Sequence, residues 1–109
     1  MINKVILVGH VGIDPEIRNH NGSKVAKIRM ATTERWKDQS GEIRENTEWH
    51  NVVAFGRKAE VIEQYIRKGS KVYVEGSIHY SSYEKDGKTY CSTDIHAAEI
   101  RMLDGNNNN

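Results

Sequence analysis

Large aromatic side chains stand among polar residues in two segments of this sequence. Trp49 alternates with Asn51 in the segment 47–55, and Trp36 has charged residues on both sides. Residues two apart in a β-strand share a face, so Trp49, Asn51 and Phe55 fall on the same side of their segment. An asparagine fits poorly in a core, and this side is therefore predicted to face solvent.

Tyr83 occupies a similar position in the segment 71–83. Alternation places its ring on the side of Ser77 and His79, opposite Ile78. Four rings are thus predicted to lie on polar faces, those of Trp36, Trp49, Phe55 and Tyr83. Cations occur near them at Lys27, Arg29 and Arg35.

Exposed rings beside cations are typical of surfaces that bind single-stranded nucleic acid. Each base that stacks on such a ring contributes about 1–3 kcal/mol, and stacking tolerates any base. The alternative is that the rings fill the core, because aromatic residues dominate many small cores. Four rings on polar faces favour the stacking surface. Tyr65 is assigned instead to a contact between helix and barrel, and Tyr73 and Tyr90 are left unassigned.

Residues for catalysis or metal binding are scattered along the chain. The five histidines, at positions 10, 20, 50, 79 and 96, form no HExxH motif, and Cys91 is the only cysteine. A zinc site needs three or four converging ligands. The segment 9–12 lacks the Gly-Lys-Ser/Thr ending of a phosphate-binding loop and is interpreted as a turn. The sequence predicts no enzyme activity, no metal site and no cofactor.

The composition indicates one globular domain in a reducing compartment. A chain of 109 residues has room for one domain with a modest core. Its net charge of +1 neither supports nor excludes nucleic-acid binding, since the clustering of cations matters more than their sum. One cysteine excludes an intrachain disulfide, and the apolar run 5–8 is too short for a signal peptide or a membrane span. We expect a cytoplasmic protein without membrane contact.

Hydrophobic patterning predicts five strands. The segment 24–35 alternates core residues with basic ones and places Ala26, Ile28 and Met30 on the core face. The other predicted strands cover residues 3–9, 47–55, 71–83 and 89–103. Asn-Gly at 21–22 and Asp-Gly at 86–87 are hairpin signals, and the polar segment 36–46 is interpreted as an extended hairpin arm or loop.

One helix is predicted over residues 57–68, with Gly69 as its C-terminal cap. Its apolar stripe consists of Ala59, Ile62, Tyr65 and Ile66. Five strands with a helix between the third and the fourth is the order of an OB-fold, a small Greek-key barrel. The predicted fold is therefore all-β with one short helix, a five-stranded Greek-key OB-fold barrel with extended hairpin arms. This domain is predicted over residues 1–104, and residues 105–109 are predicted to be a disordered C-terminal remnant.

Motifs along most of the chain resemble those of the bacterial single-stranded DNA-binding protein family. The resemblance is carried by Asn3-Lys4-Val5-Ile6-Leu7-Val8-Gly9, by Thr47-Glu48-Trp49-His50 and by Val72-Tyr73-Val74-Glu75-Gly76. It spans residues 3 to about 103 in the order expected for the family.

The resemblance implies a homotetramer that binds and protects single-stranded DNA without sequence specificity during replication, recombination and repair. It also implies a cytoplasmic, nucleoid-associated location. The stacking aromatics of the family fall on the four positions that alternation selects, Trp36, Trp49, Phe55 and Tyr83. The phosphate-binding cations of the family fall on Lys4, Arg18, Arg57, Arg67 and Lys68.

By the same analogy, His50 would lie at a subunit contact, and a satisfied core histidine is the equal alternative. Asn51, Ser81 and Ser82 stand where the family often has cations, which predicts a flatter salt dependence of binding. The family typically ends in a flexible tail with an acidic tip that recruits replication and repair proteins, and no such tip precedes Asn109. Either the tail was cut, or this protein does not recruit partners in that way.

Two rival functions are considered. A related primosomal OB-fold protein acts as a dimeric adaptor, but such proteins tend to lose the stacking tryptophans, and both are present here. An OB-fold nuclease or pyrophosphatase would need carboxylates clustered around a divalent metal, whereas the acidic residues here are dispersed. Both rivals are less consistent with the sequence than a single-stranded DNA-binding protein.

Overall fold

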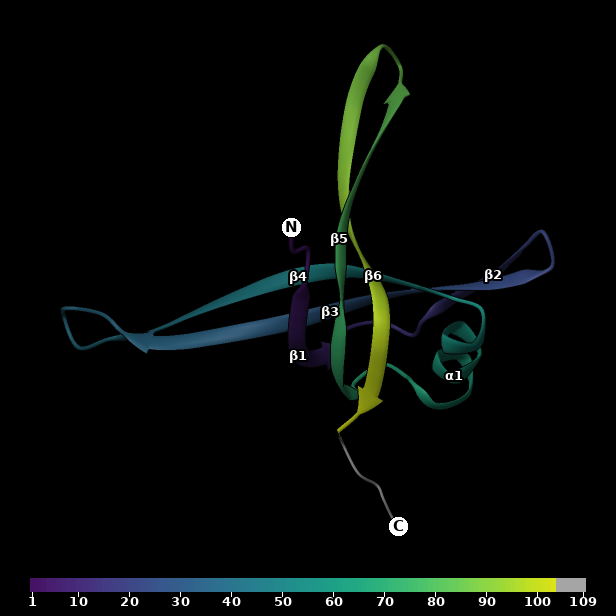
Figure 1. Ribbon diagram of the computed structural model, residues 1–109. Coiled ribbons are helices and arrows are strands. Elements are labelled where there is room, and N and C mark those ends of the chain that lie inside the picture. Colours follow the sequence, from purple (N-terminus) through teal and green to yellow (C-terminus); the bar gives the residue numbers. More distant parts are fainter. Residues whose placement is uncertain (104–109) are drawn as a thin grey trace.

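The computed structural model describes residues 1–103, which form six strands and one helix (Figure 1). The elements are β1 (Val5–Val11), β2 (Glu16–His20), β3 (Ser23–Lys37), β4 (Ile43–Phe55), α1 (Arg57–Tyr65), β5 (Lys71–Lys85) and β6 (Lys88–Met102). The predicted C-terminal remnant, residues 105–109, and the predicted domain end at 104 lie outside the described residues. No helix in the described part of the chain is long and apolar enough to cross a membrane.

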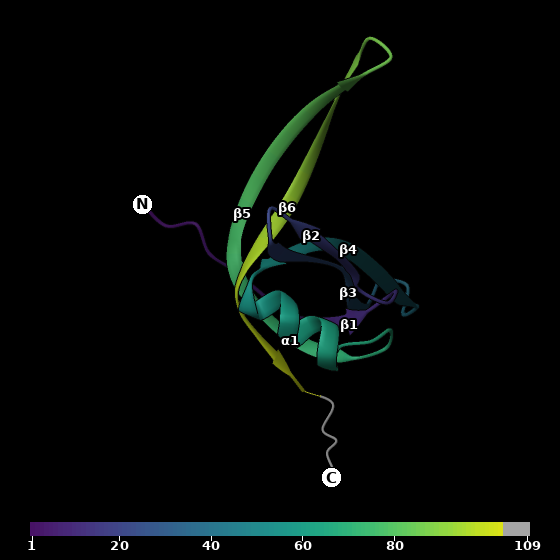
Figure 2. The same ribbon diagram turned by 90° about the vertical axis from the view of Figure 1, so that its right-hand side faces the viewer.

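Five of the strands close into a barrel. The hydrogen-bonded order is β1, β5, β6, β4 and β3, and β3 pairs with β1 again to complete the ring. All pairings within the ring are antiparallel except the one between β4 and β6. Figure 2 shows the ring of strands with α1 beside it. The predicted five-stranded OB-fold barrel with one short helix is confirmed.

Closure of the ring depends on two glycines where backbones meet. A Cβ atom on Gly9 would lie 2.1 Å from the carbonyl oxygen of Ala31, at the short pairing between β1 and β3. A Cβ atom on Gly76 would lie 2.1 Å from the carbonyl oxygen of His96, beside the bulge that shifts the register of β5 against β6. Both contacts exclude a side chain, so only glycine lets these strands approach so closely.

The barrel core includes the β3 residues that alternation assigned to it. Ala26, Ile28 and Met30 of β3 are all buried, as predicted. They pack with β-branched residues of the neighbouring strands and with one face of α1. That face contributes Ala59 and Ile62 of α1 and Ile66 just after it.

The helix is shorter than predicted and ends at Tyr65 rather than at Lys68. The backbone of Ile66 is already extended, and side chains from outside the helix accept hydrogen bonds from the backbone amides that follow. The Ser70 hydroxyl accepts a hydrogen bond from the amide of Arg67, and the Asp14 carboxylate accepts one from the amide of Lys68. These competing acceptors end the helix.

Two further expectations about this region are wrong. Tyr65 is exposed, so the contact between helix and barrel is made without its ring. Gly69 has a positive φ, but it lies in the turn that follows the helix and is not its cap. The helix end is capped by Arg67, whose guanidinium donates to the carbonyl oxygens of Glu63 and Ile66.

The segment after the first strand also differs from its prediction. Most of the turn expected at residues 9–12 belongs to strand β1 instead. Val11 is buried, and its Cα is paired with that of Met30. An unexpected strand, β2, follows and pairs with β3 alone, outside the ring. Its polar sequence lacks the alternation that marks a half-buried strand, and most of its residues are exposed.

Both predicted hairpin turns are confirmed. Asn21 and Gly22 have positive φ angles, as do Asp86 and Gly87, which is the geometry of a two-residue hairpin turn. The segment 36–46 forms the predicted hairpin arm, since β3 and β4 stay paired out to Lys37 and Ile43. Figure 1 shows this β3–β4 arm and the β5–β6 arm leaving the barrel in different directions.

Candidate nucleic-acid interface

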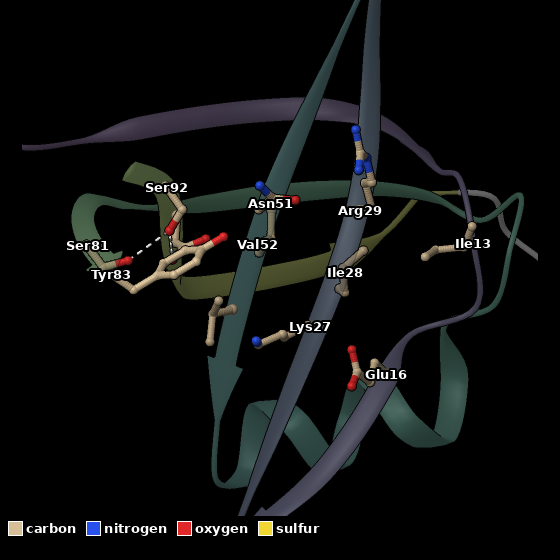
Figure 3. Close-up of a pocket in the computed structure, with 12 residues that line it drawn as sticks. Ile13, Glu16, Lys27, Ile28, Arg29, Asn51, Val52, Ser81, Tyr83 and Ser92 are labelled. Carbon is tan, nitrogen blue, oxygen red and sulfur yellow. Dashed lines mark hydrogen bonds between the residues drawn. The ribbon is translucent and has the colours of Figure 1, made fainter. Parts of the chain in front are cut away.

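A groove of about 480 Å³ lies on the outer face of the barrel, across β3, β4, β5 and β6 (Figure 3). Outward-facing residues of each strand contribute to its lining. These include Lys27 and Arg29 of β3, Asn51 of β4, Tyr83 of β5 and Asp94 of β6. The groove therefore combines two cations with two carboxylates, Asp94 and Glu16 of β2, and an amide and an aromatic ring on one open surface, which suits an extended ligand better than an enclosed small one.

Trp49 lies on the same outward face, beside the groove. The Cα of Ala31 is paired with that of Trp49, and the Cα of Arg29 with that of Asn51, so all four side chains share one side of the β3–β4 ladder. The Arg29 guanidinium carbon is 5.5 Å from the centroid of the Trp49 ring, which is a cation–π arrangement. This contact brings a positive charge to the ring that would stack a base.

Backbone just after the end of β1 supports the Trp49 ring. A Cβ atom on Gly12 would lie 2.3 Å from Cζ3 of Trp49 and 2.7 Å from Cη2, so the ring rests directly against this glycine. Half of Trp49 nevertheless remains exposed. The ring is thus held in place by Gly12 while half of the residue stays accessible, which suits a stacking platform.

Phe55 and Tyr83 are also exposed on this face, and each contacts a second ring. The Phe55 ring meets His96 edge to face, with centroids 5.3 Å apart. The Tyr83 ring stacks on Tyr90 across the β5–β6 arm, with centroids 5.4 Å apart and planes 21° apart. The sequence does not assign a role to Tyr90. The position of its ring depends on which residues of β5 and β6 are paired, and the sequence alone does not give that register.

Trp36 is exposed but is not brought to the groove. The register of β3 against β4 is unbroken along the arm, so residues an odd number apart point to opposite sides of the ladder. Trp36 and Arg29 are seven apart, and the ring therefore lies on the other side of the arm from Trp49. Three of the four predicted rings share one face, and the fourth lies on the opposite face.

The five predicted phosphate-binding cations surround the barrel without lining the groove. Lys4 forms an ion pair with Glu75, Arg18 forms one with Glu16, and Arg67 caps the helix. Arg57 and Lys68 are exposed at the start of α1 and just after its end. In the described part of the chain, the cations of the groove are Lys27 and Arg29. The sequence places these two cations, with Arg35, among the exposed rings, whereas the phosphate contacts implied by the family resemblance are other residues.

His50 lies on the side of β4 opposite Trp49, as predicted. Its Nε2 atom is 2.8 Å from the Thr32 hydroxyl oxygen, and its ring is half-buried. It is not one of the buried residues of the core. Its role at a subunit contact stays a prediction.

Two further surface clusters contain carboxylates with shifted pKa values. At the tip of the β3–β4 arm, a hydrogen bond from the Ser40 hydroxyl and another from Arg44 lower the pKa of Asp38. On the barrel, the Tyr73 phenol donates to Glu75, which raises the pKa of Tyr73 and lowers that of Glu75. Within residues 1–103, no three metal-binding side chains converge.

Comparison of the sequence with known proteins points to a single protein family. A sequence model described as the single-strand binding protein family matches residues 2–103. A "Single-stranded DNA-binding protein" of Xanthomonas campestris is 48% identical over 106 residues, covering 95% of this chain and 62% of its own length. One of Neisseria meningitidis is 46% identical over 110 residues, covering 99% of this chain and 63% of its own length. The chain spans about three-fifths of the length of these curated relatives.

Solved structures agree with the sequence comparison. A Plasmodium falciparum SSB in complex with ssDNA superposes with a TM-score of 0.88 at 34% identity, covering 94% of this chain and 96% of that one. A deletion mutant of the single-stranded DNA binding protein from Thermus aquaticus superposes with a TM-score of 0.82 at 31% identity, covering 96% of this chain and 52% of that one. The barrel, its arms and the sequence motifs thus all match those of these relatives. The chain belongs to the single-strand binding protein family.

Proposed function

We propose that this chain binds single-stranded DNA without sequence specificity. The observation that carries the proposal is the outward face on which Trp49, Phe55 and Tyr83 surround a groove containing Lys27 and Arg29. Bases would stack on the rings, and the cations would neutralise phosphates. The membership of the family and the likeness to a solved complex with ssDNA support the same function.

The chemistry of the face explains why binding would be indifferent to sequence. Every base has a flat aromatic face, and stacking on an exposed ring uses that face without reading the base edge. Phosphates are common to all nucleotides, so Lys and Arg contacts carry no sequence information. In a duplex the base faces are covered by neighbouring pairs, and the rings would find nothing to stack on.

The strand would continue beyond the groove. Trp36 lies on the other side of the β3–β4 arm, so its use as a stacking ring requires the DNA to pass around that arm. Lys4, Arg18, Arg57, Arg67 and Lys68 are the phosphate contacts proposed along this longer path. The proposed role is protection of single-stranded DNA during replication, recombination and repair, in the cytoplasm and on the nucleoid, with no chemical turnover.

The proposed assembly is a homotetramer. β1 pairs with β5 along most of its length, but within residues 1–103 its other edge pairs with β3 only at His10 and Val11. Ile6 and Val8 are exposed on this strand. A free edge beside exposed apolar side chains is a surface that a second strand can extend. Burial of this surface against another copy, with His50 at a subunit contact, is therefore proposed.

Titration of the intrinsic tryptophan fluorescence tests the proposed function. Excess oligo-dT should quench the fluorescence strongly, because a base stacked on Trp49 provides a new route of de-excitation. Duplex DNA of equal length should leave the signal nearly unchanged. Equal quenching by both DNAs, or by neither, would contradict base stacking on this face.

A further inference from the structure

Two histidines form a stacked pair beside Phe55. The rings of His79 and His96 have centroids 3.7 Å apart and planes 12° apart. The other contact of the His96 ring is the edge-to-face one with Phe55. The Ser77 hydroxyl oxygen lies 3.0 Å from Nε2 of His79 and holds the outer ring in place. The three rings make a continuous aromatic cluster, of which only Phe55 belongs to the proposed stacking set.

The histidine pair faces the same way as the groove. On β6, Ser92 and Asp94 line the groove, and His96 follows on the same side of the strand. On β5, Tyr83 and Ser81 line the groove, and alternation carries the same side back to His79. The register shift falls between Glu75 and Gly76, where Ala98 of β6 is the extra residue, so it does not interrupt the alternation on either strand here. The pair therefore extends the groove face beyond Asp94.

The charged and titratable groups around the pair come from two strands. His79 on β5 and Asp94 on β6 act on the charge of His96, while β4 contributes the uncharged Phe55 and Val53. Burial lowers the pKa of His96, the neighbouring His79 lowers it further, and the Asp94 carboxylate opposes both effects. Burial and the stacked His79 ring therefore disfavour the charged form of His96, and a negative charge brought beside the ring would favour it.

We propose that His79 and His96 form a proton-dependent phosphate subsite, which binds the DNA backbone next to a base stacked on Phe55. The inference rests on the proposed binding of single-stranded DNA and adds to it a site and a regulation. A DNA phosphate is the anion that a strand crossing Phe55 presents, and protonated imidazole is a good hydrogen-bond donor to it.

The pH dependence follows from linkage. A bound phosphate favours the charged form of His96, so the pKa of His96 is higher in the complex than in the free protein. A proton is then taken up on binding, and affinity rises as the pH falls through the pKa of His96 in the complex. The gain levels off below the pKa of His96 in the free protein. One unit of pKa difference limits the gain to about tenfold, so roughly fivefold tighter binding is expected between about pH 8 and about pH 6.

The affinity for oligo-dT, measured at both pH values and constant ionic strength, tests the subsite. A double variant, His79→Gln with His96→Gln, should lose most of the gain at low pH and show less than about a twofold change. A second double variant, His79→Phe with His96→Phe, keeps the rings without the protons. It should also lack the gain at low pH.

His20→Gln serves as the matched control, because His20 is an exposed histidine of the β2–β3 hairpin outside the cluster. It should keep the full wild-type pH dependence. Circular dichroism and mass measurements at both pH values would verify fold and assembly of each variant. The subsite is refuted if oligo-dT binds but the double variants retain the wild-type gain, or if the wild type shows none. Failure of oligo-dT to bind at either pH would refute the proposed function itself, and the subsite with it.

Discussion

At the scale of single residues, the interface depends on how each ring is held. Trp49 rests on Gly12 and faces the Arg29 guanidinium, Tyr83 stacks on Tyr90, and Phe55 meets His96. Each supporting partner restricts the ring before DNA arrives. Binding then costs less conformational entropy than it would with mobile side chains.

Substitution of Gly12 by alanine tests this support for Trp49. The added methyl group would overlap the indole ring, which must move, and we expect affinity for oligo-dT to fall by up to about 1–3 kcal/mol. Fluorescence titration measures the loss. In a Trp49→Ala background the same substitution should have almost no further effect, because the ring that it displaces is gone. Equal losses in both backgrounds would show that Gly12 acts by some other route.

At the scale of elements, alternation along a strand predicted much of the candidate site. The inward residues of β3 are buried and Lys27 and Arg29 face the groove, as the period of two requires. Partners across strands could not be predicted in this way. The stacking of Tyr83 on Tyr90 and of His79 on His96 depends on the β5–β6 register, which the sequence does not specify.

Local patterns also failed where distant residues intervene. The helical pattern continues to Lys68, but Ser70 and Asp14 accept hydrogen bonds from the amides of Arg67 and Lys68 and end the helix earlier. Asp14 is 54 residues away from Lys68 along the chain, and no window of sequence contains both. Strand β2 was missed for a related reason, since its order comes from pairing with β3 rather than from a buried face.

The outward face of β3 can be tested through the salt dependence of binding. Lys27→Ala with Arg29→Ala removes both cations of the groove. If each neutralises one phosphate, the slope of log affinity against log salt concentration should become shallower by about 1.4, at about 0.7 for each contact. Lys71→Ala, at the start of β5 and away from the groove, should leave the slope unchanged. An unchanged slope in the double variant would exclude phosphate contacts at these residues.

At the scale of the whole molecule, the ring of five strands leaves one edge of β1 largely unpaired and places two long arms outside the barrel. The proposed tetramer would cover the β1 edge and leave the groove faces open to DNA. Such an arrangement lets one strand of DNA pass from the groove of one copy to the next.

Mass measurement in solution tests the proposed assembly. Wild-type protein should have the mass of about four chains, since exposed Ile6 and Val8 would be buried between copies. Val8→Asp places a charge on that surface and should shift the protein to smaller species. A stable wild-type dimer would contradict the tetramer and favour the dimeric adaptor.

The most direct test of the central claim is the affinity for oligo-dT of two ring-deletion variants. Trp49→Ala removes a ring beside the groove, and Tyr65→Ala removes an equally exposed ring from the helix. We predict that Trp49→Ala weakens binding by about 1–3 kcal/mol, while Tyr65→Ala binds like the wild type. Equal affinity of all three proteins would contradict base stacking on the groove face.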